Sequence, residues 1–222
     1  MKKFKCEIRS WANIDLMSKR VSEKIIASGY EPDTIIGVTR GGWVPARNLC
    51  DLIGVKELLG LKIEHWGVTA NPDGKARITH RIHEDLTGKR VLLVDDITDT
   101  GESLKLAKEY IEGLNPKELK VVTLQYLTGS GFTPDFWAET IDAKSDWKWI
   151  IYPWNVMEDL CNLTGNILEE NGRDVEGIRE AFKENYQLEL DEKKIKETLE
   201  EMKRRNMAFE TSEGWRKIEC SE

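Results

Sequence analysis

No stretch of this 222-residue sequence is apolar for long enough to cross a lipid bilayer. The first ten residues, MKKFKCEIRS, turn polar at once, so we expect neither a signal peptide nor a membrane anchor. A hydrophobic content of 40% beside 33% charged residues is ordinary for a globular chain with one substantial core. We therefore expect a cytoplasmic protein with room for a second, small domain.

Cysteine and histidine are also scarce. The four cysteines lie far apart and form no C-x-x-C pair, which argues against a disulfide framework or a zinc site; they are Cys6, Cys50, Cys161 and Cys220. His80 and His83 are spaced for one helical face but have no third ligand, so we expect them at the surface. The thiols are expected to be reduced and structural.

Excess charge is confined to one part of the chain. Residues 1–154 carry 22 basic and 22 acidic groups, whereas residues 155–222 carry 11 and 18, which accounts for the whole net charge of −7. Because nucleic acid is bound through basic surfaces, the acidic C-terminal segment makes nucleic-acid binding an unfavoured interpretation.

The most informative stretch is VLLVDDITDTGESL, residues 91–104. Its continuous apolar start predicts a strand buried on both faces, as in the middle of a parallel sheet. Ligands of such sheets bind beyond the carboxyl ends of the strands. The residues that follow the apolar run include Asp95, Asp96 and Asp99. They therefore lie where a ligand would bind.

The turn after this strand has the chemistry of a phosphate site. It contains Thr98, Asp99, Thr100, Gly101, Glu102 and Ser103. A glycine that permits close approach, several hydroxyls and the first N–H groups of a following helix together suit an anion. Ser103 or Asp99 as a simple helix cap is the alternative. Capping does not explain three carboxylates so close together, so we favour a phosphate site flanked by acids.

A second loop has similar character. The stretch TIIGVTRGGWVPA, residues 34–46, predicts a buried strand that ends in Thr39, Arg40, Gly41 and Gly42. Paired glycines let backbone amides turn toward an anion, and arginine offers a forked donor to phosphate oxygens. A tight strand-to-helix turn without a ligand is the alternative for this loop taken alone.

These two loops resemble a known family. Residues 91–103 fill every position of the signature of the type I phosphoribosyltransferases: four hydrophobic residues, two acids, two variable residues, then D-T-G-x-S or T. TRGGWVPAR is similar to the pyrophosphate loop of the bacterial xanthine-guanine enzymes. In the segment WKWIIYPW, Trp149-Ile150 and Pro153-Trp154 match the wall on which those enzymes stack a purine.

The resemblance implies roles for the residues already named. Phosphoribosyl pyrophosphate (PRPP) and a purine base are the implied substrates, with Mg²⁺ as cofactor and a homodimer as the assembly. Asp95 and Asp96 would hold the ribose hydroxyls and the Mg²⁺, and Asp99 would handle a proton of the purine ring. Residues 98–103 would bind the 5′-phosphate and residues 39–42 the pyrophosphate. A flexible lid is implied within residues 67–89, where Arg77 or Arg81 would reach the pyrophosphate.

One departure from the family pattern concerns the base. Related purine enzymes place a lysine near the end of the strand that corresponds to residues 120–127, where it bonds the 6-oxo group. This sequence has Gln125, Tyr126 and Leu127 there. Either Lys148 or the backbone near Trp149 takes that role, or the base is different. A phosphoribosyltransferase for another base and a non-catalytic regulator that senses PRPP therefore remain as alternatives to a 6-oxopurine enzyme.

We thus predict an α/β domain over residues 1–154, with a central, mostly parallel sheet flanked by helices. Residues 67–89 and 128–148 are expected as loops. Residues 155–222 are expected as a small helical or winged-helix-like domain, with helices at 156–169, 174–185 and 191–205 and a hairpin at 207–218. Because its lysines are offset by glutamates, packing or dimer contact is the favoured role of this domain.

Overall fold

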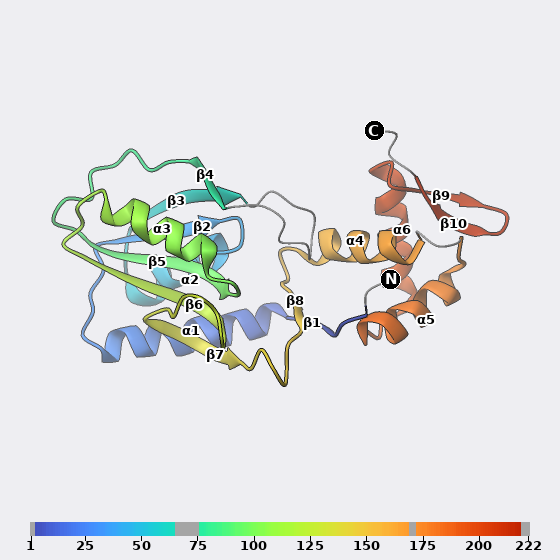
Figure 1. Ribbon diagram of the computed structural model, residues 1–222, viewed down its shortest axis with the longest axis horizontal. Helices are drawn as coiled ribbons and strands as arrows, with labels where there is room; N and C mark the ends of the chain where they lie inside the picture. Colours follow the sequence, from blue (N-terminus) through green and yellow to red (C-terminus); the bar gives the residue numbers. More distant parts are fainter. Residues whose placement is uncertain (1–2, 65–75, 169–171, 219–222) are drawn as a thin grey trace. The chain divides into compact units, whose positions relative to one another are not determined.

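The chain forms two compact units, drawn in Figure 1. The computed structural model describes residues 3–64, 76–168 and 172–218. One unit is Trp11–Trp147, and the other combines Met1–Ser10 with Lys148–Glu222. Within the described residues, no helix has the length and apolar character needed to cross a bilayer.

The first unit is built on a six-stranded sheet with the order β4-β3-β2-β5-β6-β7. The strands are β2 (Thr34–Thr39), β3 (Glu57–Glu64), β4 (Arg77–His80), β5 (Arg90–Thr98), β6 (Glu118–Leu127) and β7 (Phe136–Ile141). All neighbouring pairs are parallel except β3 and β4, which are antiparallel. The mostly parallel sheet predicted from the sequence is therefore confirmed.

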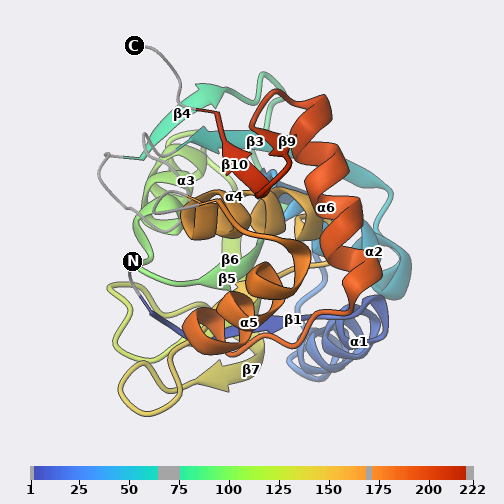
Figure 2. The ribbon, with the colours of Figure 1, turned by 90° about the vertical axis from the view of Figure 1, so that its right-hand side faces the viewer.

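Helices cover both faces of this sheet, as Figures 1 and 2 show. Side chains of α1 (Trp11–Ala27) and α2 (Trp43–Ile53) share a core with Leu92 and Val94 of β5, whereas α3 (Glu102–Glu112) shares another with Val91 and Leu93. Alternate residues of β5 thus enter opposite cores. This is why the strand reads as a continuous apolar run.

Two edge strands were not predicted. β4 lies in the segment expected as a lid, and β7 lies in the segment expected as a turn-rich loop, so these two loop predictions are wrong at those positions. Each strand commits few apolar side chains: Ile78 of β4 packs against one core, and Phe136 and Ala138 of β7 pack against the other. Because an edge strand buries so few apolar side chains, its pattern of apolar and polar residues is too weak to predict a strand.

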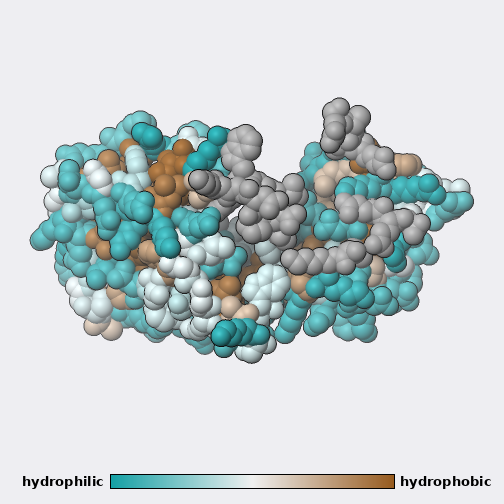
Figure 3. Space-filling model, in the orientation of Figure 1, coloured by the Kyte–Doolittle hydropathy of each residue, from teal (hydrophilic) through white to brown (hydrophobic). Residues whose placement is uncertain are grey.

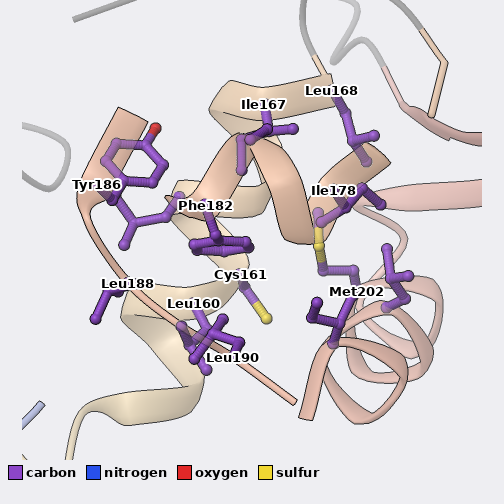
Figure 4. Close-up of a cluster of buried hydrophobic side chains, with 14 of the residues drawn as sticks. Leu160, Cys161, Ile167, Leu168, Ile178, Phe182, Tyr186, Leu188, Leu190 and Met202 are labelled. Atoms are coloured by element: carbon purple, nitrogen blue, oxygen red, sulfur yellow. The ribbon is translucent and has the colours of Figure 1, made fainter. Parts of the chain in front are cut away.

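The second unit contains the predicted three helices and hairpin. They are α4 (Val156–Leu168), α5 (Val175–Tyr186), α6 (Glu192–Arg204), β9 (Ala208–Thr211) and β10 (Gly214–Lys217). Asp174 and Asp191 cap α5 and α6, since their carboxylates accept from the N–H groups of Gly177 and Lys194. Figure 4 shows part of the core that the three helices enclose, including Phe182, Tyr186 and Met202.

The boundary between the units differs from the expected one. β8 (Trp149–Ile151) pairs in parallel with β1 (Cys6–Ile8) in a separate two-stranded sheet. Cys6 and Ile151 belong to the same buried cluster as the helices of the second unit. The division therefore falls after Trp147 rather than after Trp154, and the first ten residues belong with the C-terminal segment.

The surface seen in Figure 3 is mostly hydrophilic in both units. Three cysteines, Cys6, Cys50 and Cys161, are buried free thiols, as predicted for structural cysteines. Burial raises the pKa of Cys6 to about 12, helped by the charge of Asp159, so this thiol is held in its unreactive protonated form. Cys220 lies outside the described residues.

Candidate functional site

The two loops singled out in the sequence meet at one edge of the sheet. β2 and β5 are adjacent and parallel, with Gly37 in register with Val94. Thr39 is the last residue of β2 and residues 40–42 follow it, whereas residues 95–98 are the last four residues of β5. The carboxyl ends of neighbouring parallel strands face the same way, so the structure brings the glycine loop and the acidic pair together, at the place where such sheets bind ligands.

The backbone of the glycine loop lies directly against the acids. A Cβ placed on Gly41 would overlap the carboxyl group of Asp96, lying 2.6 Å from its Cγ. A Cβ on Gly42 would lie 2.8 Å from the Cα of Asp95 and would collide with the carbonyl oxygen of Val94. Both positions therefore require glycine so that the loop backbone can lie against β5. This explains the Gly-Gly pair apart from the backbone flexibility that a turn needs.

Asp95 and Asp96 form an acidic pair, in which Asp95 is buried and Asp96 half-buried. Asp95 is 9% exposed. The N–H of Asp96 donates to Asp95 Oδ1 at 2.9 Å, and the N–H of Ile97 donates to Asp96 Oδ1 at 2.8 Å. Burial, and then the charge of Asp96, hold the pKa of Asp95 well above its usual range, and burial raises the pKa of Asp96 to about 6. Negative charge here is costly unless a ligand brings donors or a cation.

This pair fits a magnesium ion held jointly with a substrate. Carboxylate oxygens are the hard ligands that Mg²⁺ prefers, and it commonly uses one or two of them together with phosphate oxygens and water. Among the described residues, no group of three or more His, Cys, Asp or Glu side chains is placed to hold a metal. The donor set of the protein is thus compatible with a shared ion.

The phosphate loop begins α3 without a side-chain cap. Its N-cap residue is Gly101, with φ of +84°, which has no side chain to form a cap, and the N–H of Glu102 donates to Thr100 Oγ1 at 3.4 Å. The interpretation of Ser103 or Asp99 as the helix cap is therefore wrong. A glycine N-cap brings the bare backbone of the first turn to the surface, which is the arrangement that suits an anion at a helix N-terminus.

Residues of this loop differ in what they offer a ligand. Thr98 is 1% exposed and its hydroxyl lies 3.3 Å from that of Thr123, so its side chain serves the packing of β5 against β6. Asp99 and Thr100 are exposed. Partial desolvation of its carboxyl group raises the pKa of Asp99 above its usual range.

A supporting loop behind the phosphate loop was missed in the sequence. The N–H of Gly131 donates to the carbonyl oxygen of Thr100 at 3.0 Å. A Cβ on Gly101 would lie 2.5 Å from the Cβ of Phe132 and 3.0 Å from Ser130 Oγ. Residues 130–132 thus fix the turn at Gly101 from behind. The Gly-Ser-Gly run at 129–131 is the feature of the sequence that could have indicated this supporting loop.

The remaining predicted residues fall into two groups. Arg77 in β4 and Arg81 just after it are both exposed, and residues 67–75 of the expected lid lie outside the described residues. Lys148, Trp149 and Ile150 belong to the second compact unit. There Lys148 Nζ lies 2.7 Å from Glu7 Oε2, Trp149 Nε1 donates to Asp159 Oδ1 at 3.2 Å, and Ile150 is buried.

Known proteins share this sequence pattern and fold. The chain is 33% identical to a purine phosphoribosyltransferase from Pyrococcus horikoshii Ot3, with a TM-score of 0.58 over 67% of this chain and 93% of that one. It is 29% identical over 114 residues to the hypoxanthine phosphoribosyltransferase of Salmonella typhimurium, and 32% identical over 113 residues to the hypoxanthine-guanine phosphoribosyltransferase of Aquifex aeolicus.

Those two matches cover 51% and 47% of this chain and 64% and 62% of the relatives, so the chain spans less than two thirds of the length of either curated relative. Residues 7–158 match the phosphoribosyl transferase domain family. That range includes both loops and the acidic pair described above, and the chain belongs to the type I phosphoribosyltransferase family, where it is similar to the purine enzymes.

Proposed function

We propose that this protein transfers the 5-phosphoribosyl group of PRPP to a 6-oxopurine, namely xanthine, guanine or hypoxanthine, for purine salvage. A ring nitrogen of the base forms a bond to the anomeric carbon, the bond from that carbon to the pyrophosphate oxygen breaks, and the electron pair leaves with pyrophosphate. The proton of the base nitrogen passes to an acceptor. The products are a nucleoside monophosphate and pyrophosphate.

The observation that carries this proposal is the approach of Gly41 and Gly42 to Asp96 and Asp95. The glycine loop, which suits an anion, contacts the acidic pair, which suits ribose hydroxyls. The N-terminus of α3 comes a few residues after that pair in the chain. A substrate with phosphates at both ends of a ribose matches this order. PRPP is such a molecule.

The residues would divide the work as follows. Asp95 and Asp96 would bind the ribose hydroxyls and Mg²⁺, whose charge would neutralise the pyrophosphate. Residues 98–103 would hold the 5′-phosphate, and Thr39, Arg40 and the two glycines would hold the pyrophosphate. Positive charge develops on the ribose in the transition state, so the buried carboxylates would stabilise it where it forms. Asp99 would accept the proton of the base.

The assignment of base recognition rests on the family resemblance. Trp149 and Ile150 would provide the stacking wall, with Lys148 or the backbone beside it meeting the 6-oxo group. Leu127 at the end of β6 is apolar and 8% exposed, so that position brings no cation to the base. A base other than a 6-oxopurine is the second candidate for this reason. A homodimer in the cytoplasm is the proposed state of the enzyme.

The test is pyrophosphate release from PRPP and Mg²⁺ with a panel of bases. We expect release with xanthine, guanine or hypoxanthine and none with adenine, uracil or orotate. Release with one of the latter alone would replace the proposed base. If PRPP binds and no base yields pyrophosphate, the chain is a PRPP-sensing regulator instead. The same reactions without Mg²⁺ test the metal requirement.

A further inference from the structure

A hollow borders the candidate pyrophosphate loop, within the first compact unit. Its volume is about 470 Å³, and it is lined by Thr39, Arg40, Trp43, Gly60, Lys62 and His80. Ligand pockets in proteins commonly fall between about 300 and 1,000 Å³. We call this hollow the Trp43 pocket. None of Asp95, Asp96 or Asp99 lines it, so it is distinct from the acidic part of the site.

Three of its lining residues form one row across three strands. Thr39 of β2 is in register with Lys62 of β3, and Lys62 is in register with His80 of β4. Residues in register on adjacent strands point to the same face of a sheet. The hydroxyl, ammonium and imidazole groups therefore stand side by side on one face.

An aromatic wall completes the pocket. Trp43, the first residue of α2, is 42% exposed although it is large and apolar. A Cβ on Gly60 would lie 3.3 Å from Trp43 Cζ3 and 3.5 Å from the methyl carbon of Thr39. The bare backbone of Gly60 thus lets the indole lie against β3. An exposed indole face is a stacking surface for a flat ring.

The rim of the pocket favours an anion. Arg40 and Lys62 each bring a positive charge and His80 adds an imidazole, and Lys62 Nζ lies 2.5 Å from Glu64 Oε1. A lysine ammonium has three N–H donors, so this ion pair leaves donors for a second acceptor. A ligand with both a flat ring and phosphate groups would use the wall and the rim together.

We propose that the Trp43 pocket binds a purine nucleoside diphosphate, with the ring stacked on Trp43 and the phosphates at Lys62 and His80. A purine covers more of the indole than a pyrimidine does, and two phosphates match the charge of the rim. Because Thr39 and Arg40 also belong to the candidate pyrophosphate loop, a bound nucleotide competes with pyrophosphate for the same loop. Only this competition with pyrophosphate rests on the proposed function.

The test is equilibrium binding of GDP and ADP to the full chain, compared with guanosine and CDP. Stacking of a base on an aromatic residue is worth enough that Trp43→Ala should weaken binding of both purine diphosphates at least tenfold. Lys62→Gln should weaken binding of GDP several-fold and leave that of guanosine unchanged. Trp11→Ala, which removes another exposed tryptophan, is the matched control and should change neither.

Three results would overturn the proposal. Equal GDP affinity in Trp43→Ala and in the natural sequence would show that the nucleotide binds elsewhere. A change of sedimentation coefficient in Trp43→Ala would show that this face is an interface between copies. A large fall in pyrophosphate release by Trp43→Ala without nucleotide would place Trp43 in the active site. If no base supports pyrophosphate release, the binding results still decide the pocket on their own.

Discussion

A side chain on Gly41 would take the space of the Asp96 carboxyl group, because its Cβ would lie 2.6 Å from Asp96 Cγ. Gly41→Ala must therefore push the glycine loop away from the acidic pair or turn the carboxyl group. Since either shift separates the two halves of the proposed PRPP site, we expect the KM for PRPP to rise at least tenfold. Steady-state kinetics of pyrophosphate release would measure it.

Gly165→Ala is the control for that substitution. Gly165 lies within α4, and a Cβ there would meet only Lys217 Cε, at 3.9 Å, among the described atoms. Alanine in a helix interior is favoured over glycine by about 0.5–1 kcal/mol. We expect an unchanged KM and a slightly higher Tm. An equal effect of both substitutions on the KM would contradict the close approach of Gly41 to Asp96.

Gly101→Ala should damage the phosphate loop for a different reason. The φ of +84° at this position strains any L side chain, and the new Cβ would lie 2.9 Å from the backbone nitrogen of Phe132. We expect a loss of about 1–3 kcal/mol in the free energy of unfolding and a weaker affinity for PRPP. Urea unfolding and calorimetric titration would measure the two effects. Unchanged values of both would show that the supporting loop at 130–132 does not hold the turn.

The raised pKa of Asp96 predicts a pH-dependent stability. A carboxyl group whose pKa is raised in the folded state binds its proton more tightly there than in the unfolded chain, so stability falls as pH rises between the two pKa values. For Asp96 that window runs from about 4, its usual value, to about 6. Asp96→Asn keeps an oxygen that can accept from the N–H of Ile97 and removes the charge.

We therefore expect Asp96→Asn to raise the Tm at pH 7.5 and to change it little at pH 4, in the absence of PRPP and metal. The same variant should lose affinity for PRPP with Mg²⁺ if Asp96 has the proposed roles of metal ligand and ribose acceptor. Calorimetry of the natural sequence and of Asp96→Asn at the two pH values would measure the Tm differences. A Tm difference of the same size at both would show that the charge of Asp96 is not the cause.

Much of the first unit could be predicted because its core strands carry strong signals. β5 supplies alternate residues to two cores, and Asp95 and Asp96 stand where its apolar run ends. The edge strands β4 and β7 could not be predicted in the same way, since each buries few side chains. Close approach of the two loops also has no signature in sequence beyond the glycines themselves.

The pairing of β1 with β8 lay beyond the reach of sequence reasoning for another reason. The two strands have three residues each and are separated by about 140 positions. Short strands have too little pattern to identify a partner. The C-terminal helices, in contrast, carried capping aspartates and apolar spacing, and they begin directly after Asp174 and Asp191, within one residue of the predicted starts.

The first ten residues should stabilise the C-terminal unit. Phe4 lies with its ring centroid 5.1 Å from that of Tyr186, and its N–H donates to the carbonyl oxygen of Asn185 at 2.9 Å. Phe4→Ala should cost about 1–3 kcal/mol for a partly buried ring. Hydrogen exchange should rise in α5 and stay unchanged in β5. Leu16→Ala, at an exposed position of α1, should change neither. Equal exchange in α5 with and without the ring would contradict the assignment of the N-terminus to this unit.

Asp99 offers the sharpest test of the proposed chemistry. It follows β5 directly, and partial burial raises the pKa of its carboxyl group. If it accepts the proton of the base, Asp99→Asn should lower kcat by a factor of about 10² to 10⁴, the usual contribution of a general base, and should change the KM for PRPP less than threefold. Glu102→Gln removes a neighbouring exposed carboxylate from the same loop. Because Glu102 would serve the phosphate only through its backbone, that variant should keep its kcat. An equal fall in both variants would point to the charge of the loop rather than to proton transfer by Asp99.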